Sequence, residues 1–250
     1  MERAILYVDG FNFYYGVTKH WWGKNKDLAG LGWCDFHALI ERHFHLGDAQ
    51  LEIKYFTAPV HFENNEEHKR YAVWARAVRT IAGIRVMEGF YKPKSRPDPA
   101  TKSREEKQSD VNLAVEVMLD ALGPTPPRKV YLLSDDRDLM PVVFALRERV
   151  QTPIEFFVLL PSRADPRNWQ ESYRGTAQKL MGLRPTERDQ IPMPTVELLT
   201  EGMLASSLLS YTLQDPEGKF DCLNEWRLGS EYLERRCMTP EWRPDPPPEG

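Results

Sequence analysis

The chain contains 250 residues, 41% of them hydrophobic, and includes seven Trp, eleven Phe and ten Tyr. This composition supplies enough apolar side chain for one sizeable buried core and excludes collagenous, fibrous and wholly disordered chains. The formal net charge of -4 at pH 7 gives the whole chain no attraction to a polyanion. No apolar run reaches the roughly 18 residues that a membrane-spanning helix needs, so we expect a soluble, cytoplasmic protein with no membrane partner.

Apolar segments of strand length alternate along the chain with segments of helical period. Strands are predicted over residues 4–8, 51–56, 84–90, 129–133 and 154–160. Helices are predicted over residues 64–82, 109–122 and 139–149. Strands that alternate with helices predict an α/β domain of three layers, with a central, mostly parallel sheet flanked by helices.

The C-terminal part of the chain differs from this pattern. We expect a main domain over residues 1–180 and a C-terminal extension over residues 181–238, in which a helix and a short hairpin lie between residues 195 and 226 and pack on the main domain. Residues 239–250 contain five Pro and predict an extended or disordered tail. Within the main domain, the three Pro between Lys92 and Arg104 predict a loop.

Two of the predicted strands end in Asp residues. Asp9 follows the first strand, and Asp136 and Asp138 follow the fourth. Because ligands of open parallel sheets bind beyond the carboxyl ends of the strands, we expect these side chains to lie together at one edge. Each also has a structural explanation, since Asp9-Gly10 is suited to a turn and Asp138 to capping the next helix. Their joint placement favours a functional site.

Asp110 is a third candidate, near the start of the predicted helix 109–122. At 100° per residue it shares a sector with Leu113 and Val117, so we expect it to point inward, where a carboxylate needs a cation or hydrogen bonds. Alternatively, it complements the helix N-terminus behind a Ser109 cap. The opposite sector predicts a solvated stripe and contains Asn112, Glu116 and Asp120.

A cluster of Asp9, Asp110, Asp136 and Asp138 concentrates negative charge. A fold tolerates this when a cation is bound or when some carboxyl pKa values are raised. Hard oxygen ligands without His or Cys favour Mg²⁺ or Mn²⁺. Such an ion activates water and stabilises the charge that builds on a phosphodiester during hydrolysis. We therefore expect a Mg²⁺ or Mn²⁺ site at these residues.

Basic residues are also grouped. Those of the loop before Asp110 are Lys92, Lys94, Arg96, Lys102 and Arg104, and those along one side of the helix 64–82 are Lys69, Arg76 and Arg79. Each group is suited to a phosphate backbone or, alternatively, forms an ordinary solvated surface. Aromatic residues follow Asp9 closely and are expected either to stack on unpaired bases or to pack in the core: Phe11, Phe13, Tyr14, Tyr15, Trp21 and Trp22.

The cysteines predict neither disulfides nor a Cys-based metal site. Cys34, Cys222 and Cys237 are odd in number and lack CxxC spacing. A zinc site from Cys34, His37, His43 and His45 is an alternative to an amphipathic helix with its histidines near the surface. We favour the amphipathic helix.

Three ordered motifs resemble those of NYN-domain proteins of the LabA-like group, which have the PIN-like nuclease fold. They are Tyr7-Val8-Asp9-Gly10-Phe11-Asn12, Lys107-Gln108-Ser109-Asp110-Val111 and the run from Leu132 to Pro141. The resemblance implies a metal-dependent ribonuclease with Asp9, Asp110, Asp136 and Asp138 as the acidic cluster and Asn12 as a polar partner. In the third motif, Asp135 and Arg137 stand where the family usually has Gly and Ser, and Arg137 is suited either to pairing with a carboxylate or to holding a phosphate.

The sequence thus predicts hydrolysis of a phosphodiester bond in single-stranded or structured RNA. It is also compatible with a homo-oligomer. The expected substrate-binding residues are Lys92, Lys94, Arg96, Lys102, Arg104, Lys107, Ser134 and Arg137. One alternative is an RNA-binding or regulatory module of the same fold that cleaves little. Another is an aspartyl-phosphate hydrolase, which is disfavoured because Phe11 stands where such enzymes carry a second Asp.

Overall fold

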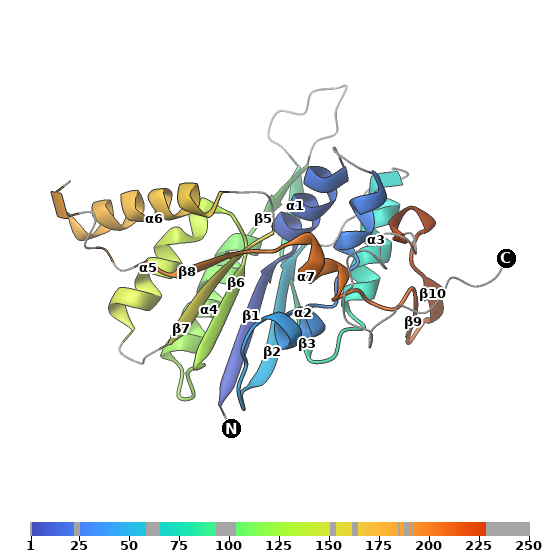
Figure 1. Ribbon diagram of the computed structural model, residues 1–250, viewed down its shortest axis with the longest axis horizontal. Helices are drawn as coiled ribbons and strands as arrows, with labels where there is room; N and C mark the ends of the chain where they lie inside the picture. Colours follow the sequence, from blue (N-terminus) through green and yellow to red (C-terminus); the bar gives the residue numbers. More distant parts are fainter. Residues whose placement is uncertain are drawn as a thin grey trace.

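The computed structural model describes residues 2–22, 26–58, 66–93, 104–150, 154–161, 165–184, 186–187, 191 and 193–228 (Figure 1). A six-stranded sheet, in the order β3-β2-β1-β6-β7-β8, forms its centre, and all neighbouring strands in it are parallel. The strands are β1 (Arg3–Asp9), β2 (Gln50–Thr57), β3 (Ile84–Glu88), β6 (Lys129–Leu133), β7 (Glu155–Leu160) and β8 (Thr195–Leu198). The predicted α/β class is confirmed.

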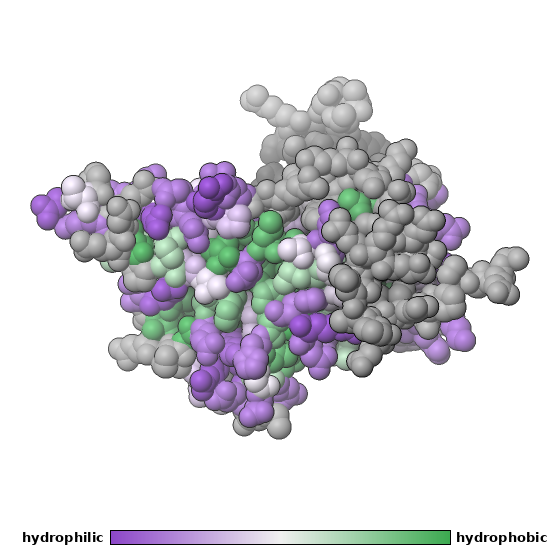
Figure 2. All heavy atoms as spheres, viewed as in Figure 1, coloured by the Kyte–Doolittle hydropathy of each residue, from purple (hydrophilic) through white to green (hydrophobic). Residues whose placement is uncertain are grey.

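Helices cover both faces of this sheet. On one face lie α1 (Gly10–Trp22), α2 (Phe36–His43), α3 (Glu66–Val78) and α7 (Glu201–Ala205), and on the other lie α4 (Ser109–Leu122), α5 (Met140–Arg149) and α6 (Pro166–Met181). Alternate residues of β1 enter the two cores, with Leu6 in the first and Tyr7 in the second. The outer side of α6 is polar, and Figure 2 shows the corresponding hydrophilic end of the molecule at the left.

The first core is rich in aromatic side chains. Phe13 of α1 packs edge-on against Phe36 of α2, with ring centroids 4.9 Å apart, and Trp33 lies 6.2 Å from Trp74 of α3. The chain turns sharply from β1 into α1 at Gly10, where an added Cβ would lie 2.5 Å from the Tyr55 ring. Only glycine therefore allows α1 to begin directly behind Asp9.

The C-terminal segment contributes to both the sheet and its covering layer. β8 extends the sheet beside β7, while β9 (Thr212–Asp215) and β10 (Gly218–Asp221) form the predicted hairpin. Arg76 of α3 pairs with Asp215 and lies 4.1 Å from the centroid of the Phe220 ring. Arg76, predicted to track a phosphate backbone, thus anchors the hairpin. The domain boundary at residue 180 stays a prediction.

The outer face of α4 contradicts the predicted solvated stripe. The side chains of Glu116 and Asp120 are only 20% and 15% exposed, because both bind Nζ of the buried Lys54 on β2, at 2.7 and 2.6 Å. The solvent-facing residues of α4 are apolar and 49–66% exposed: Val111, Val115, Leu119 and Leu122. The sector assignment was wrong because β2 carries a cation on the face that α4 covers.

The predicted loop between Lys92 and Arg104 begins and ends in a two-stranded ribbon. β4 (Phe90–Pro93) pairs antiparallel with β5 (Arg104–Lys107), and α4 begins two residues after β5. Residues 94–103 and the predicted tail 239–250 lie outside the described residues. Among the helices described, none is both long enough and apolar enough to cross a membrane.

Candidate metal centre

Asp9 ends β1 and is 5% exposed. Its Oδ1 accepts the backbone N–H of Asn12 at 3.0 Å, in the first turn of α1. Its Oδ2 accepts the hydroxyl of Ser134 at 3.0 Å, from the segment that follows β6. Both carboxylate oxygens are therefore held in place by neutral donors.

Asp136 follows β6, the strand that lies parallel to β1. Its backbone N–H donates to the Ser134 hydroxyl at 3.0 Å, so Ser134 links the Asp9 carboxylate to the Asp136 backbone. The Asp136 side chain accepts the backbone N–H of Asp138 at 2.9 Å and caps the short helix η2 (Arg137–Leu139). The alternative role of Asp138 as the cap of the next helix is not observed, since α5 has Leu139 at its N-cap position without a side-chain capping bond.

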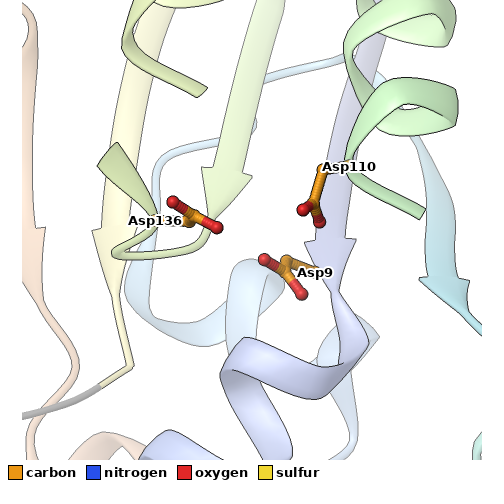
Figure 3. A group of neighbouring side chains, drawn as sticks. All are labelled: Asp9, Asp110 and Asp136. Carbon is orange, nitrogen blue, oxygen red and sulfur yellow. The ribbon is translucent and has the colours of Figure 1, made fainter. Parts of the chain in front are cut away.

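Asp110 is the second residue of α4 and approaches from the other side. Gln108, immediately before α4, has a positive φ of 79°, a conformation that non-glycine residues adopt rarely. Gln108 occupies the N-cap position without a side-chain capping bond, so the predicted Ser109 cap is absent. Figure 3 shows the carboxylates of Asp9, Asp110 and Asp136 converging, and one oxygen of each lies within 4.8 Å of the others.

The environment of Asp9 favours its protonated form. The pKa of Asp9 is raised to about 7, mainly by burial and in part by the charges of Asp110 and Asp136, against the hydrogen bonds from Asn12 and Ser134, which lower it. A divalent cation would reverse this preference, because it stabilises the ionised carboxylate. The three oxygens are hard ligands at mutual distances suited to one ion, so the donor set fits Mg²⁺ or Mn²⁺.

Asn12 and Asp138 occupy different places around this cluster. The Asn12 amide donates to Oδ1 of Asp135 at 2.7 Å and accepts the Asp135 backbone N–H at 3.0 Å. This paired contact ties α1 to the turn after β6, with Asp135 where the family usually has Gly. Asp138 is exposed and is not part of the group within 4.8 Å.

The structure describes only some of the predicted substrate-binding residues. Ser134 is 1% exposed, with its hydroxyl bound to Asp9, and Arg137 is exposed beside Asp136. Lys92, Arg104 and Lys107 lie in β4 and β5, but their side chains are not among those described. Lys94, Arg96 and Lys102 lie outside the described residues.

The residues of the disfavoured zinc site do not form a cluster among the residues that the structure describes. Cys34 is buried, which raises the pKa of its thiol, while His37 lies 3.8 Å from Glu41 and His43 bonds Ser206. Within the described part of the chain, the one group of acidic, His and Cys side chains placed to hold a metal is the Asp cluster. Phe11 stacks on Tyr71, with centroids 5.4 Å apart, which gives it a packing role in α1.

Sequence reasoning missed the far wall of the site. Asn12, Asp135, Asp136 and Arg137 line a pocket of about 520 Å³ together with Asp165, Asn168 and Trp169 from the start of α6. The signal was available, because Asp165-Pro166 is a typical helix start and comes a short distance after the end of β7 at Leu160.

Comparison with known proteins agrees with the geometry. Residues 3–167 match the model of the NYN domain. The chain is 28% identical over 198 residues to 6-hydroxy-3-succinoylpyridine 3-monooxygenase of Pseudomonas putida strain S16; the match covers 66% of this chain and 62% of that protein, less than two thirds of its length.

Among solved structures, a Vibrio parahaemolyticus protein of unknown function is similar at 17% identity and a TM-score of 0.45, over 80% of this chain and 93% of that one. The family match covers most of the central sheet, from β1 to the start of α6, and includes the three converging Asp residues. The chain therefore belongs to the NYN domain family.

Proposed function

We propose that this protein is a ribonuclease of the LabA-like group, which hydrolyses RNA phosphodiester bonds with the help of Mg²⁺ or Mn²⁺. The observation that carries the proposal is the convergence of Asp9, Asp110 and Asp136 at the carboxyl edge of a parallel sheet. Ligands of such sheets bind at this edge, and NYN domains are generally nucleases.

Each residue of the centre has a distinct part in the proposed reaction. Asp9, Asp110 and Asp136 would hold the cation, which when bound supplies an activated water and neutralises charge on the phosphodiester. Ser134 and the Asn12 backbone fix the Asp9 carboxylate, and the Asn12 side chain fixes Asp135. Asp138, exposed next to Asp136, would orient a water molecule, and Arg137 would hold a phosphate.

The proposed substrate path crosses the basic ribbon before α4. Lys92, Arg104 and Lys107 belong to β4 and β5, which lead directly to Asp110. Lys94, Arg96 and Lys102 follow in the same segment of the sequence. Lysine and arginine side chains in this position would neutralise phosphates on either side of the bond that is cut.

Cleavage of labelled single-stranded and hairpin RNAs tests the proposal. The assay compares Mg²⁺, Mn²⁺ and EDTA, and compares wild type with Asp9→Asn and Asp136→Asn. We expect each variant to lower the cleavage rate by more than about a hundredfold. Loss of a residue that only hydrogen-bonds a metal ligand already lowers metal affinity or activity by about 10- to 100-fold. Asp48→Asn, an exposed turn residue, is the matched control.

Three outcomes would contradict a metal-dependent nuclease. Cleavage that survives in EDTA or in both variants would point to a contaminant. RNA binding without cleavage by any form would favour a binding or regulatory module. Release of phosphate from monoesters alone would favour a phosphohydrolase. Because one relative is named as a 6-hydroxy-3-succinoylpyridine 3-monooxygenase, oxygen uptake with that compound and a reductant is measured in parallel.

A further inference from the structure

The helix α4 is apolar on its outward side as well as on its inward side. Its inward side packs on β1, β2 and α5. On its outward side, four apolar residues share a sector of about 80°, at 100° per residue. These residues, which are 49–66% exposed, form the α4 face: Val111, Val115, Leu119 and Leu122. Since a helix that is apolar all round is typical of a buried position, the α4 face indicates a surface that another molecule covers.

No charged side chain of α4 interrupts this face. Asp110 belongs to the three-Asp cluster, and Glu116 and Asp120 bind Lys54 of β2. The partly buried residues along one border of the face are also apolar: Ala114 and Met118. The α4 face is therefore a continuous apolar surface along the length of the helix.

The chemistry of the face is unsuited to nucleic acid or to a membrane surface. The sequence of α4 contains no Lys or Arg. Proteins bind a phosphate backbone with cationic side chains, and helices that lie on a membrane carry Lys or Arg on their polar side. The α4 face therefore fits the apolar surface of a protein.

A second copy of α4 offers a matching surface. The four residues are spaced four, four and three positions apart, so they form one seam along the helix. In an antiparallel pair related by a two-fold axis, Val111 of one copy faces Leu122 of the other, and Val115 faces Leu119. Each contact then occurs twice, as an interface between identical surfaces requires, and each places a valine against a leucine.

The acidic cluster favours the antiparallel direction. Asp110 lies at the N-terminal end of α4, where it converges with Asp9 and Asp136. A parallel pair would bring two such clusters side by side, where like charges repel. An antiparallel pair keeps the clusters at opposite ends of a helix of 14 residues, which is about 20 Å long, and also aligns the helix dipoles favourably.

The area of the face is sufficient for a stable dimer. Val and Leu residues at these exposed fractions present roughly 400 Å² of apolar surface on each copy. Because about 60% of an interface is apolar, two such faces would form the core of an interface of roughly 1,300 Å² in total. Stable complexes bury about 1,200–2,000 Å².

We propose that this protein forms a two-fold symmetric homodimer through antiparallel contact of the α4 face with its copy. The proposal goes beyond the proposed nuclease function and does not rest on it. The dimer covers the apolar residues of α4 and leaves the three-Asp cluster of each copy at its own end of the helix pair.

Sedimentation velocity of the full chain in EDTA tests the dimer without metal or RNA. We expect the mass to rise from that of one chain to that of two between about 1 and 100 µM, the range of a moderately stable interface. Val115→Lys and Leu119→Glu should each weaken the dimer by about a hundredfold or more, because each buries an unpaired charge at two symmetric contacts. Leu180→Glu, at a 46% exposed position of α6, is the matched control and should leave the dimer unchanged.

Both substituted positions are exposed in the single chain, so the variants should keep the circular dichroism spectrum of wild type. Mixing the two variants then tests the antiparallel pairing. In a mixed dimer, Val115→Lys of one copy faces Leu119→Glu of the other, and the second contact is that of wild type. We expect the mixture to associate at least about tenfold more tightly than either variant alone, because opposite charges meet.

Three results would count against the proposal. The mass of one chain at every concentration would overturn the dimer, and flotation of this monomer with phosphatidylserine vesicles would then assign the α4 face to a membrane. A dimer that survives both substitutions would place the interface elsewhere. Loss of the dimer in both variants without recovery in the mixture would overturn the antiparallel pairing. Because these measurements need no catalysis, a protein that cuts no RNA could still form the proposed dimer.

Discussion

Two acidic clusters lie along one side of the sheet and are stabilised in opposite ways. Near the middle of α4, Glu116 and Asp120 bind Lys54, and the Tyr7 hydroxyl donates to Asp120 at 2.5 Å. At the start of α4, Asp110 joins Asp9 and Asp136, and the groups that act on Asp9 are neutral donors and further carboxylates. The first cluster contains its own cation, whereas the second consists of three carboxylates that, in the proposed function, would bind a divalent cation.

The difference teaches how to separate a structural cluster from a binding site. Glu116 and Asp120 already share a buried lysine, so they gain little by binding a further ion and mainly fix α4 against β2. Three converging carboxylates, one with a raised pKa, gain directly from a divalent cation. A cluster of acidic residues therefore does not by itself indicate a metal site. The charge of the groups that contact these residues distinguishes a structural cluster from a binding site.

Removing the cation of the first cluster should have the largest effect on stability. Lys54→Met should lower the free energy of unfolding by about 3–5 kcal/mol, because Glu116 and Asp120, with side chains 20% and 15% exposed, then lose the buried ammonium that binds both. Asp120 keeps Arg3, at 3.8 Å, as a more distant cationic neighbour. Urea denaturation at pH 7 measures the change. Lys219→Met, at an exposed position of β10, is the control and should change the free energy by less than about 0.5 kcal/mol.

A combined variant sharpens this prediction. Lys54→Met with Glu116→Gln and Asp120→Asn removes all three charges, so much of the lost stability should return. A loss of less than about 1 kcal/mol in Lys54→Met alone would show that the three groups are not coupled as the geometry indicates.

Removing the carboxylate of Asp9 should have the opposite sign in metal-free protein. Folding raises the pKa of Asp9 from 3.8 to about 7, so its favourable contribution is complete below pH 4 and is lost as the pH rises through 7. At pH 8 we expect Asp9→Asn to be more stable than wild type by about 2–4 kcal/mol.

The same measurement in EDTA at pH 4 provides the control. Near this pH Asp9 is protonated in the folded chain and about two fifths protonated in the unfolded chain, whose pKa is 3.8, so the two proteins should differ much less than at pH 8. Equal stability at pH 8 would mean that the ionised carboxylate is solvated in the folded protein, contrary to its burial.

The sequence predicted the class of fold and the second cluster for a simple reason. Strands β1 and β6 are neighbours and parallel, so residues directly after them, Asp9 and Asp136, must share an edge. The helical period placed Asp110 on the inward side of α4, and the structure brings it to the other two carboxylates. These predictions needed only local periodicity and the geometry of parallel sheets.

The first cluster escaped prediction because it depends on contacts between distant elements. Leu51, Ile53 and Tyr55 alternate with polar residues, a pattern typical of a strand with one solvated face, but helices cover both faces of β2, and Lys54 is 5% exposed. Glu116 and Asp120 therefore face a cation rather than water. Recognising this required knowing that α4 crosses β2, which no local pattern contains.

Metal addition should stabilise the protein through the second cluster. At about a hundredfold excess over its dissociation constant, Mg²⁺ or Mn²⁺ should raise the free energy of unfolding by about 2.7 kcal/mol. The gain should shrink between pH 8 and pH 5, because the cation must displace the proton that Asp9 binds with a pKa of about 7. Denaturation with and without the ion measures it, and Asp9→Asn should show no comparable gain.

Neutralising Asp120 of the first cluster should have the smallest effect on the stabilisation that Mg²⁺ produces. Asp120→Asn should lower the basal free energy of unfolding, since Lys54 and Tyr7 lose a charged partner. The increment produced by Mg²⁺ should nevertheless stay within about 0.5 kcal/mol of wild type, because Asp120 is absent from the converging group. An increment that falls as far as in Asp9→Asn would contradict the separation of the two clusters, because the ion would then depend on the charge that Lys54 already neutralises.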